Sequence, residues 1–324
     1  MGNSITVKAY AKINLSLDVI ERMDNGYHRI ETVMQQINLS DDIIIESHGT
    51  AGLYKGYHIK LESADKRLPV PEDNLAYKAA KLMAEMFCPF KDNKLVIKLD
   101  KEIPMAAGLA GGSSDAAAVM LGLCKLWNIP VELENLFKIG KDLGADIPFC
   151  IAGNAYNNPH LGFAHDPKAS SAALAEGIGE ILTPIPSLSG WVVLAKPDIS
   201  VPTPFVYQRL TAYDALPGQG GDVDRPDTQA LISHIKEHNT KQITKNMLNV
   251  LETVGLKEYP IVVYTKNKIG EAGGADAILM SGSGPTVFAY YESEKDALKG
   301  YETSMDVLIS NSGHKYDIYL AQLL

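Results

Sequence analysis

Apolar and polar residues alternate along the first part of the chain, which is the pattern of half-buried β-strands. Residues 5–20 alternate in this way, and Asp24-Asn25-Gly26 behind them is typical of a turn. Residues 30–39, 42–47 and 58–63 are predicted to be further strands. The N-terminal part of the chain is therefore expected to consist mainly of β-structure.

The pattern changes to a helical period after residue 70. Asn74 follows Pro71 as a cap-type residue, and apolar positions at helical spacing then predict a helix over residues 74–86. Residues 94–99 are predicted to be a strand that leads into a glycine-rich stretch. The alanine-rich segment behind that stretch is predicted to be a helix ending at about Trp127.

The rest of the chain mixes both periods. The pattern predicts helices at 132–143 and 293–305, strands at 147–152, 191–195, 277–280, 286–290 and 316–322, a helix or a strand–helix passage at 261–274, and irregular segments at 154–173 and 212–228. Strands and helices that follow one another without strict alternation favour an α+β fold over a doubly wound sheet.

Composition narrows the class of protein. The 324 residues are 46% hydrophobic and 21% charged, which fits a folded protein of one large or two medium domains. The net charge of −9 argues against a general nucleic-acid binder, although it allows a local basic pocket. Because no apolar run approaches the ~20 residues of a membrane span and no signal-peptide pattern precedes the first strand, we expect a cytoplasmic protein without a membrane partner. Cys88, Cys124 and Cys150 lack metal-ligand spacing, which predicts thiols in a reducing compartment.

Residues 104–118, Pro-Met-Ala-Ala-Gly-Leu-Ala-Gly-Gly-Ser-Ser-Asp-Ala-Ala-Ala, carry the strongest chemical signal. Glycines allow the backbone to approach a ligand closely, and the N–H groups and positive dipole at a helix N-terminus favour phosphate. The stretch is not a P-loop, because it has neither that spacing nor a lysine. A tight turn for strand–helix packing would need one glycine, whereas Gly108, Gly111 and Gly112 stand here together. The stretch therefore predicts a phosphate site.

Three other signals are weaker when each is taken alone. Lys12 and Asn14 share one face of the first strand, although a solvated strand lysine would look the same. Asp146 in Gly-Ala-Asp-Ile-Pro-Phe could be a catalytic base or the cap of a turn. The stretch that begins Ser281-Gly-Ser-Gly-Pro could be a hairpin or a ligand loop, and Gly26-Tyr-His could be an ordinary turn.

In this order, the motifs Ala11-Lys-Ile-Asn-Leu, Pro104 to Ala117, Gly144-Ala-Asp-Ile-Pro-Phe and Ser281-Gly-Ser-Gly-Pro resemble those of the GHMP small-molecule kinases. The resemblance runs from about residue 5 to the C-terminus and is thin between 208 and 275. It implies the α+β GHMP kinase fold, with an ATP-binding domain at 1–182 and a substrate-side domain at 183–324 that meet at a ligand cleft.

The resemblance also implies a reaction. ATP, with Mg²⁺, would phosphorylate the 2-hydroxyl of the methylerythritol unit of a cytidine diphosphate ester. The segments around Asn25-Gly-Tyr-His and Val201-Pro-Thr-Pro-Phe-Val-Tyr distinguish this substrate from homoserine, mevalonate or a sugar. Those three substrates, and a non-catalytic nucleotide-binding regulator on the same fold, are the alternatives. The resemblance leaves open whether the protein is a monomer or a homodimer.

Residue roles follow from the same resemblance. Asp146 would be the catalytic base and Lys12 its electrostatic partner. ATP would be bound by Asn74, Pro104, Ala107, Gly108, Leu109, Ala110, Gly111, Gly112, Ser113, Ser114 and Asp115, with Ser113 or Ser114 near Mg²⁺. The second substrate would be bound by Asn14, Tyr27, His28, Thr203 and Tyr207, where two aromatic rings stack on the base and His28 reads it.

The chain departs from the family pattern at three places. Ala110 stands where glycine is usual, and we expect a negative φ for it. Ser283 lies in a turn that varies, and residues 154–173 look like an insertion.

Overall fold

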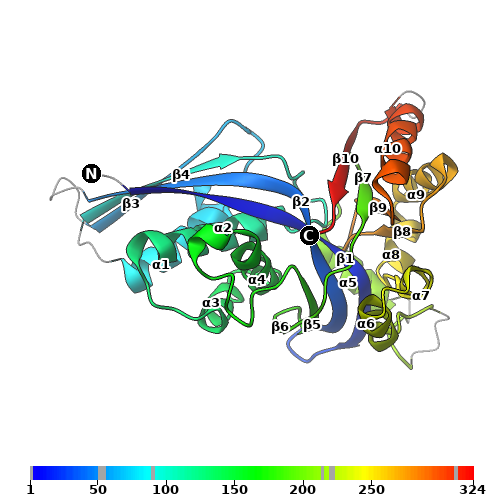
Figure 1. Ribbon diagram of the computed structural model, residues 1–324, viewed down its shortest axis with the longest axis horizontal. Helices are drawn as coiled ribbons and strands as arrows, with labels where there is room; N and C mark the ends of the chain where they lie inside the picture. The colour runs from blue at the N-terminus through cyan, green and yellow to red at the C-terminus, as the bar shows by residue number, and fades with distance from the viewer. Residues whose placement is uncertain (1–2, 50–55, 89–91, 213–214, 219–222, 310–312) are drawn as a thin grey trace. The chain divides into compact units, whose positions relative to one another are not determined.

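The computed structural model describes residues 3–49, 56–88, 92–212, 215–218, 223–309 and 313–324 (Figure 1). The chain folds into two compact units that interleave along the sequence. The first unit contains residues 1–11, 39–103 and 110–171, and the second contains residues 12–38, 104–109 and 172–324. The units interleave because two long strands, β1 (Asn3–Arg22) and β2 (His28–Gly49), contribute residues to both. The division of the chain into consecutive domains at residue 182 stays a prediction.

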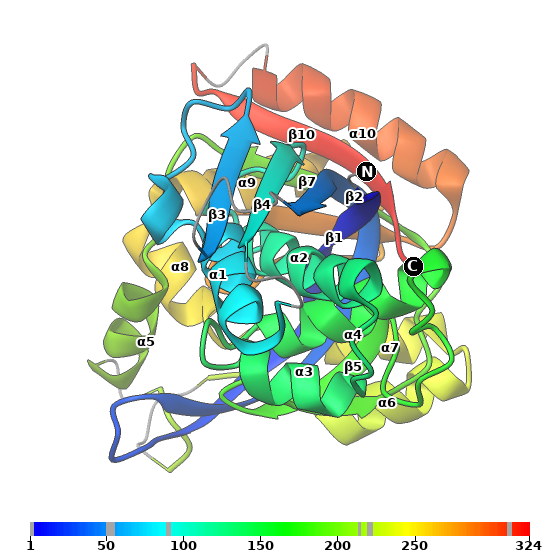
Figure 2. The same ribbon diagram turned by 90° about the vertical axis from the view of Figure 1, so that its left-hand side faces the viewer.

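A β-sheet and a layer of helices make up the first unit. The C-terminal half of β2 pairs antiparallel with β4 (Asp92–Asp100), which pairs parallel with β3 (Gly56–Ser63). The helices are α1 (Leu75–Phe87), α2 (Gly111–Trp127), α3 (Leu133–Gly140) and α4 (Ile147–Asn157), with the 3₁₀ turns η1 (Pro71–Asp73) and η2 (Pro159–Leu161). Figure 2 faces these helices, of which α2 packs against both α1 and α4.

Helix α2 is the central element of that layer. Its residues from Ser114 to Cys124 are all buried. A Cβ added at Gly122 would meet Ile45 at 2.5 Å and Val7 at 3.2 Å, so the helix lies close against β1 and β2. This contact fixes the direction in which the N-terminus of α2 points.

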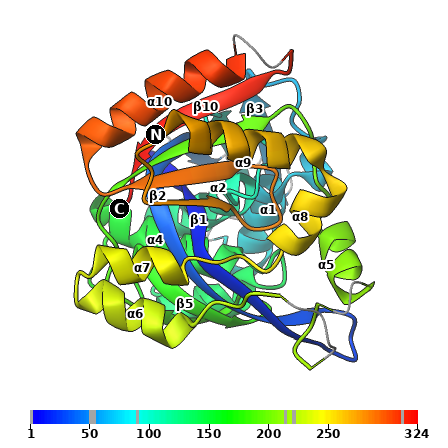
Figure 3. The same ribbon diagram turned by 90° about the vertical axis from the view of Figure 1, so that its right-hand side faces the viewer.

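The second unit contains a four-stranded antiparallel sheet in the order β10-β7-β9-β8. Its strands are β7 (Trp191–Pro197), β8 (Ala277–Met280), β9 (Val287–Tyr291) and β10 (Tyr316–Gln322). Helices α9 (Pro260–Ala272) and α10 (Glu294–Ile309) pack against this sheet (Figure 3). The core between them includes Val193, Val287, Tyr291 and Leu308.

The rest of the second unit surrounds the N-terminal hairpin. The N-terminal half of β2 pairs with β5 (Ala172–Gly177), which pairs with β6 (Ile181–Pro184). Four helices follow along the chain: α5 (Thr203–Ala212), α6 (Thr228–Lys236), α7 (Thr240–Asn246) and α8 (Glu252–Glu258). None of the helices in the described parts of the chain combines the length and the apolar composition that crossing a membrane takes.

The mixture of helices and sheets confirms the α+β prediction, but three local expectations change. The strand predicted at 147–152 is wrong, because these residues form α4. A short apolar run buried on all sides looks alike in both structures, and Pro148 fits the first turn of a helix. The segment predicted to be irregular from residue 154 continues α4 to Asn157, and residues 261–274 are essentially one helix, α9. The connection predicted at 212–228 falls partly outside the described residues.

Candidate active site

Strand β1 carries a buried polar face. Lys12, Asn14, Ser16 and Asp18 alternate with apolar residues, and Lys12 is only 3% exposed. The solvated-lysine alternative is therefore wrong. A strand with polar side chains on one buried face cannot have been selected for packing alone, because each buried polar group must be satisfied by a partner.

Lys12 is held by neighbours from two segments of the second unit, residues 12–38 and 104–109. Its Nζ donates to Asn14 Oδ1 at 2.7 Å and to the Gly108 carbonyl at 3.3 Å, and its backbone N–H donates to Leu109 O at 3.1 Å. Asn14 Nδ2 donates in turn to Thr32 Oγ1 at 2.8 Å, which fixes the amide orientation. The structure thus brings together Lys12, Asn14 and Gly108 from the predicted set.

The second glycine-rich turn joins this group. Ser281 Oγ donates to Gly108 O at 2.9 Å, and a Cβ added at Gly282 would lie 3.4 Å from Asn14 Oδ1 and 3.5 Å from Lys12 Nζ. The turn links two antiparallel strands, β8 and β9, which confirms the hairpin alternative, and a ligand-binding role for it stays a prediction. We call Lys12, Asn14, Gly108, Ser281 and Gly282 the Lys12 cluster.

The N-terminus of α2 carries the glycines on which the prediction of a phosphate site rests. Ala110 precedes the helix with φ 57° and ψ 27° and offers no side-chain cap. The expectation of a negative φ is wrong, because the sharp entry into the helix requires a left-handed residue. Gly112 is exposed at the first turn, where N–H groups have no intrahelical partner. These N–H groups can bind phosphate oxygens.

The two serines of this turn have different surroundings. Ser114 is fully buried, and its hydroxyl donates to Tyr10 O at 2.7 Å. Asn154 Nδ2 donates to the Ser114 carbonyl at 3.1 Å and so holds the serine from the other side. Ser113 is half-buried and lies one residue nearer to the exposed Gly112. Of these two serines, Ser113 is therefore the one whose side chain is not fully buried.

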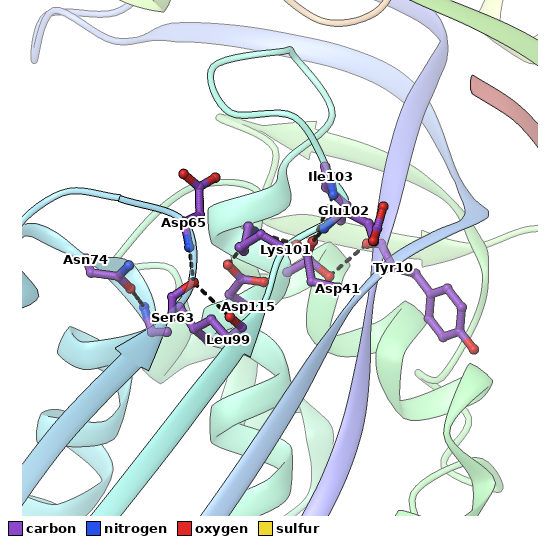
Figure 4. Close-up of polar contacts among 12 residues, drawn as sticks. Tyr10, Asp41, Ser63, Asp65, Asn74, Leu99, Lys101, Glu102, Ile103 and Asp115 are labelled. Carbon is purple, nitrogen blue, oxygen red and sulfur yellow. Dashed lines mark hydrogen bonds and ion pairs between the residues drawn. The ribbon is translucent and has the colours of Figure 1, made fainter. Parts of the chain in front are cut away.

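Asp115 faces the protein interior. Its Oδ2 accepts from Lys101 Nζ at 2.7 Å, and the same ammonium donates to Asp41 Oδ2 at 2.5 Å (Figure 4). Asp41 Oδ1 also accepts from the backbone N–H groups of Glu102 and Ile103 at 2.7 and 2.8 Å. Burial, together with the neighbouring Asp41 carboxylate, raises the pKa of Asp115 to about 8. Asp115 therefore supports the turn from below rather than facing a ligand.

Lys101 and Asp41 were not predicted from the sequence. Each is an ordinary charged residue beside a strand, and only the fold brings the two within hydrogen-bonding distance of Asp115. The lysine lies beneath the glycine turn, since a Cβ added at Gly111 would be 3.6 Å from its Nζ. The turn thus has a buried cation under it, although its own sequence contains none.

Asp146 begins α4 in the first unit. Its backbone carbonyl accepts from Cys150 N at 3.0 Å, and its side chain makes no capping bond. The carboxylate therefore does not cap α4. The residue is half-buried, and the Cβ position of Gly144, two residues before it, lies 4.0 Å from Ser113 Oγ.

Asn74 performs the capping role predicted for it. Its Oδ1 accepts from Ala76 N at 2.8 Å, and the side chain is 6% exposed. A role in nucleotide binding would therefore fall to its Nδ2. Pro104, Ala107 and Leu109 are buried in the glycine-rich stretch, where they shape the backbone rather than present polar groups.

An aromatic group lies at the other end of the β1–β2 hairpin. The rings of His28 and Tyr207 have centroids 5.2 Å apart with planes inclined by 36°. Tyr27 follows the turn at residues 24–26 and is 60% exposed, which leaves its ring available for stacking. Thr203, at the start of α5, bonds Ser283 through the two hydroxyls at 2.8 Å. The structure therefore brings His28 and Tyr207 together, as predicted.

Thr211 determines which ring nitrogen of His28 carries the proton. Its hydroxyl donates to Tyr207 O at 3.3 Å, so the same oxygen accepts from His28 Nε2 at 3.0 Å. Burial and the charge of Arg22 lower the pKa of His28, which keeps the ring neutral at pH 7. Nδ1 is consequently an acceptor, suited to an amino group of a base. Sequence reasoning missed Thr211 because a helical threonine carries no chemical signal of its own.

Comparisons with known proteins agree with this geometry. The model of the GHMP kinases N terminal domain matches residues 74–154, and that of the GHMP kinases C terminal domain matches residues 231–302. A homoserine kinase from Cytophaga hutchinsonii shares the fold with a TM-score of 0.69 at 18% identity, over 99% of this chain and 95% of its own. The protein is a GHMP kinase.

Relatives with higher sequence identity show to which family of GHMP kinases the chain belongs. The 4-diphosphocytidyl-2-C-methyl-D-erythritol kinases of Acetivibrio thermocellus and Alkaliphilus oremlandii are each 42% identical over 92% of this chain, and over 94% and 91% of their own lengths. A crystal structure of 4-(cytidine 5'-diphospho)-2C-methyl-D-erythritol kinase has a TM-score of 0.71 at 28% identity and covers 98% of this chain and 99% of its own. The chain belongs to the family of 4-diphosphocytidyl-2-C-methyl-D-erythritol kinases.

Proposed function

We propose that this chain transfers the terminal phosphoryl group of ATP to the 2-hydroxyl of 4-diphosphocytidyl-2-C-methyl-D-erythritol, in the cytoplasm. The observation that carries the choice of substrate is the group formed by His28, Tyr207 and Thr211. An acceptor nitrogen beside an aromatic ring suits the amino edge and the face of a cytosine. Homoserine, mevalonate and a sugar offer neither feature.

Phosphoryl transfer asks the protein for positioning and for stabilisation of charge. In the proposal, Asp146 accepts the proton of the 2-hydroxyl, and Lys12 stabilises charge on the transferred group. The N–H groups at the start of α2 bind the ATP phosphates, and Asn74 contacts the adenine. Mg²⁺ would neutralise phosphate charge with Ser113 beside it, which fits an ion that keeps most of its ligands from water and phosphates. Tyr27 and Tyr207 stack on the cytosine, while Asn14 and Thr203 contact the substrate.

A panel of acceptors tests the substrate. ADP release is measured with the cytidine ester, homoserine, mevalonate and galactose at equal concentrations. We expect turnover with the cytidine ester alone. Turnover of one of the others without the cytidine ester would overturn the proposal, and ATP binding without any turnover would favour the non-catalytic regulator.

Two variants test the assigned roles. Asp146→Asn should lower kcat by about 10²- to 10⁴-fold, the usual contribution of a general base. Tyr27→Ala should raise the KM of the cytidine ester by roughly 5- to 100-fold, as expected for loss of one stacking interaction, and leave that of ATP nearly unchanged. An unchanged kcat in the first variant would remove Asp146 as the base. A larger effect on ATP in the second would remove the stacking role.

A further inference from the structure

Residues 248–251, between α7 and α8, and Glu252 at the start of α8 bond to two parts of the second unit that carry the Lys12 cluster. One part is strand β1. Leu17 N donates to Leu248 O and Val250 N donates to Leu17 O, both at 2.9 Å, so the segment forms a short parallel bridge to the strand. Leu17 lies on the same strand as Lys12 and Asn14.

The other part is the glycine-rich turn behind β8. Asn249 is 5% exposed, and its Nδ2 donates to the carbonyls of Met280 and Gly282, both at 2.8 Å. Its Oδ1 accepts from Leu251 N at 3.0 Å. Both amide protons are therefore used, and they hold the backbone on either side of Ser281.

The neighbouring Glu252 strengthens this attachment. Its Oε1 accepts from Met280 N at 2.7 Å, and Lys266 Nζ donates to both carboxylate oxygens at 2.7 and 2.8 Å. The last residue of β8 is thus held through its N–H by Glu252 and through its carbonyl by Asn249. A buried amide with every donor occupied adopts one orientation, which makes it a rigid spacer.

We propose that Asn249 is a positioning residue for phosphoryl transfer, which sets the distance between the turn at Ser281–Gly282 and Lys12 on β1. This inference rests on the proposed function. Asn249 acts through the turn and is not itself assigned to the reacting atoms. The turn lies beside the lysine, because a Cβ added at Gly282 would be in van der Waals contact with Lys12 Nζ, at 3.5 Å. A displaced turn would therefore alter the surroundings of the Lys12 ammonium.

The expected kinetic signature follows from what Lys12 does. A group that stabilises charge on the transferred phosphoryl acts in the transition state, so its misplacement lowers kcat more than it changes KM. A displacement of about 1 Å in an active site can cost roughly 100-fold in rate. The groups assigned to adenine and cytosine, Asn74, Tyr27 and Tyr207, receive no hydrogen bond from Asn249.

Asn249→Asp is the test, because it keeps the shape and replaces both donor protons by a carboxylate oxygen facing two carbonyls. Asn246→Asp is the matched control: its amide also donates to a backbone carbonyl, that of Gln242 at 2.9 Å, within α7. kcat and both KM values are measured by ADP release, and folding by circular dichroism. We expect Asn249→Asp to lower kcat by about 30- to 100-fold with both KM values within threefold, and Asn246→Asp to change kcat by less than twofold.

Other outcomes decide against the inference. A kcat within twofold of the parent protein, with a lowered unfolding midpoint, would make Asn249 a purely structural residue. If Asn249→Asp does not fold, Asn249→Ser, which is uncharged and too short to bridge both carbonyls, must show the same selective loss of kcat, and normal kcat there refutes the role. Failure of the parent protein to turn over the cytidine ester would instead refute the proposed function.

Discussion

Replacing Gly108 by alanine would place a methyl group on the carbonyl oxygen of Ser281. The added Cβ would lie 2.2 Å from that oxygen and 3.2 Å from Gly284 O, both of them backbone atoms. Gly108 also has φ 75°, which side chains rarely adopt. Its carbonyl receives hydrogen bonds from Lys12 Nζ and from Ser281 Oγ. The substitution thus strains the backbone, and separation of the two segments is needed to relieve the overlap.

The size of the effect can be compared with a second glycine. Gly162, which follows η2, is left-handed with φ 90° and ψ 7°, and an added Cβ there would meet only Lys125 Nζ, at an ordinary contact distance of 3.7 Å. Gly162→Ala should therefore cost only the left-handed strain, about 1–2 kcal/mol. Gly108→Ala adds the overlap, which typically costs about 1–3 kcal/mol when packed atoms must move. We expect Gly108→Ala to be the less stable variant by roughly 2 kcal/mol.

The two variants should differ in kcat as well as in stability. Relieving the overlap moves the Gly108 carbonyl or the Ser281 turn by on the order of 1 Å, which predicts a loss of kcat of about 100-fold. Urea unfolding measures the stability difference, and ADP release measures kcat for both variants. Equal stability and equal kcat for Gly108→Ala and Gly162→Ala would refute the contact between Gly108 and the Ser281 turn.

Three further predictions follow from the same geometry. Ala110→Gly should raise the free energy of unfolding by about 1 kcal/mol, because it relieves a left-handed alanine, and a lower urea midpoint would contradict this. Thr211→Val should raise the KM of the cytidine ester by about fivefold, the value of one neutral hydrogen bond, and an unchanged preference for cytidine over uridine esters would remove its role in fixing the His28 tautomer. Because burial lowers the pKa of His28, the KM of the cytidine ester should stay constant through pH 7 and rise only below the ordinary histidine pKa of about 6.5. In that range protonation turns Nδ1 from an acceptor into a donor. The KM of ATP should not change in the same way.

Elements with a strong local signal were predicted nearly to the residue. Helix α2 ends at Trp127 and β10 spans Tyr316–Gln322, as expected. Helix α4 was missed because its residues are buried on every side, so the run carries no periodicity. Helix α2 is also buried over most of its length, but its alanine-rich sequence favours a helix by intrinsic propensity.

The residues of the candidate site also divide into those that the local sequence predicts and those that it does not. The motifs around Lys12, Gly108 and Asp146 were found from the sequence, because glycine-rich turns and isolated polar residues in apolar runs are visible there. The residues that orient them were not, since Asn249, Lys101 and Thr211 are ordinary residue types whose partners lie far away in the sequence or in backbone carbonyls. Such residues become recognisable only in the folded structure, where they are buried. Because an unsatisfied buried polar group is costly, the hydrogen bonds of a buried polar side chain show which groups it holds in place.

Ala110 illustrates what the local sequence leaves undetermined. An alanine before a helix is expected to have a negative φ, and nothing in its neighbours contradicts that expectation. The structure places it at φ 57°, with Ala106 at φ 49° in the same stretch. Two strained alanines in one short loop cost on the order of 1–2 kcal/mol each, so contacts with residues outside the loop must stabilise its conformation. Lys101 provides such contacts under the first turn of α2, where it bonds to both Asp41 and Asp115. Asp41 accepts from the N–H groups of Glu102 and Ile103, which precede the loop, and Asp115 belongs to the helix that follows the loop.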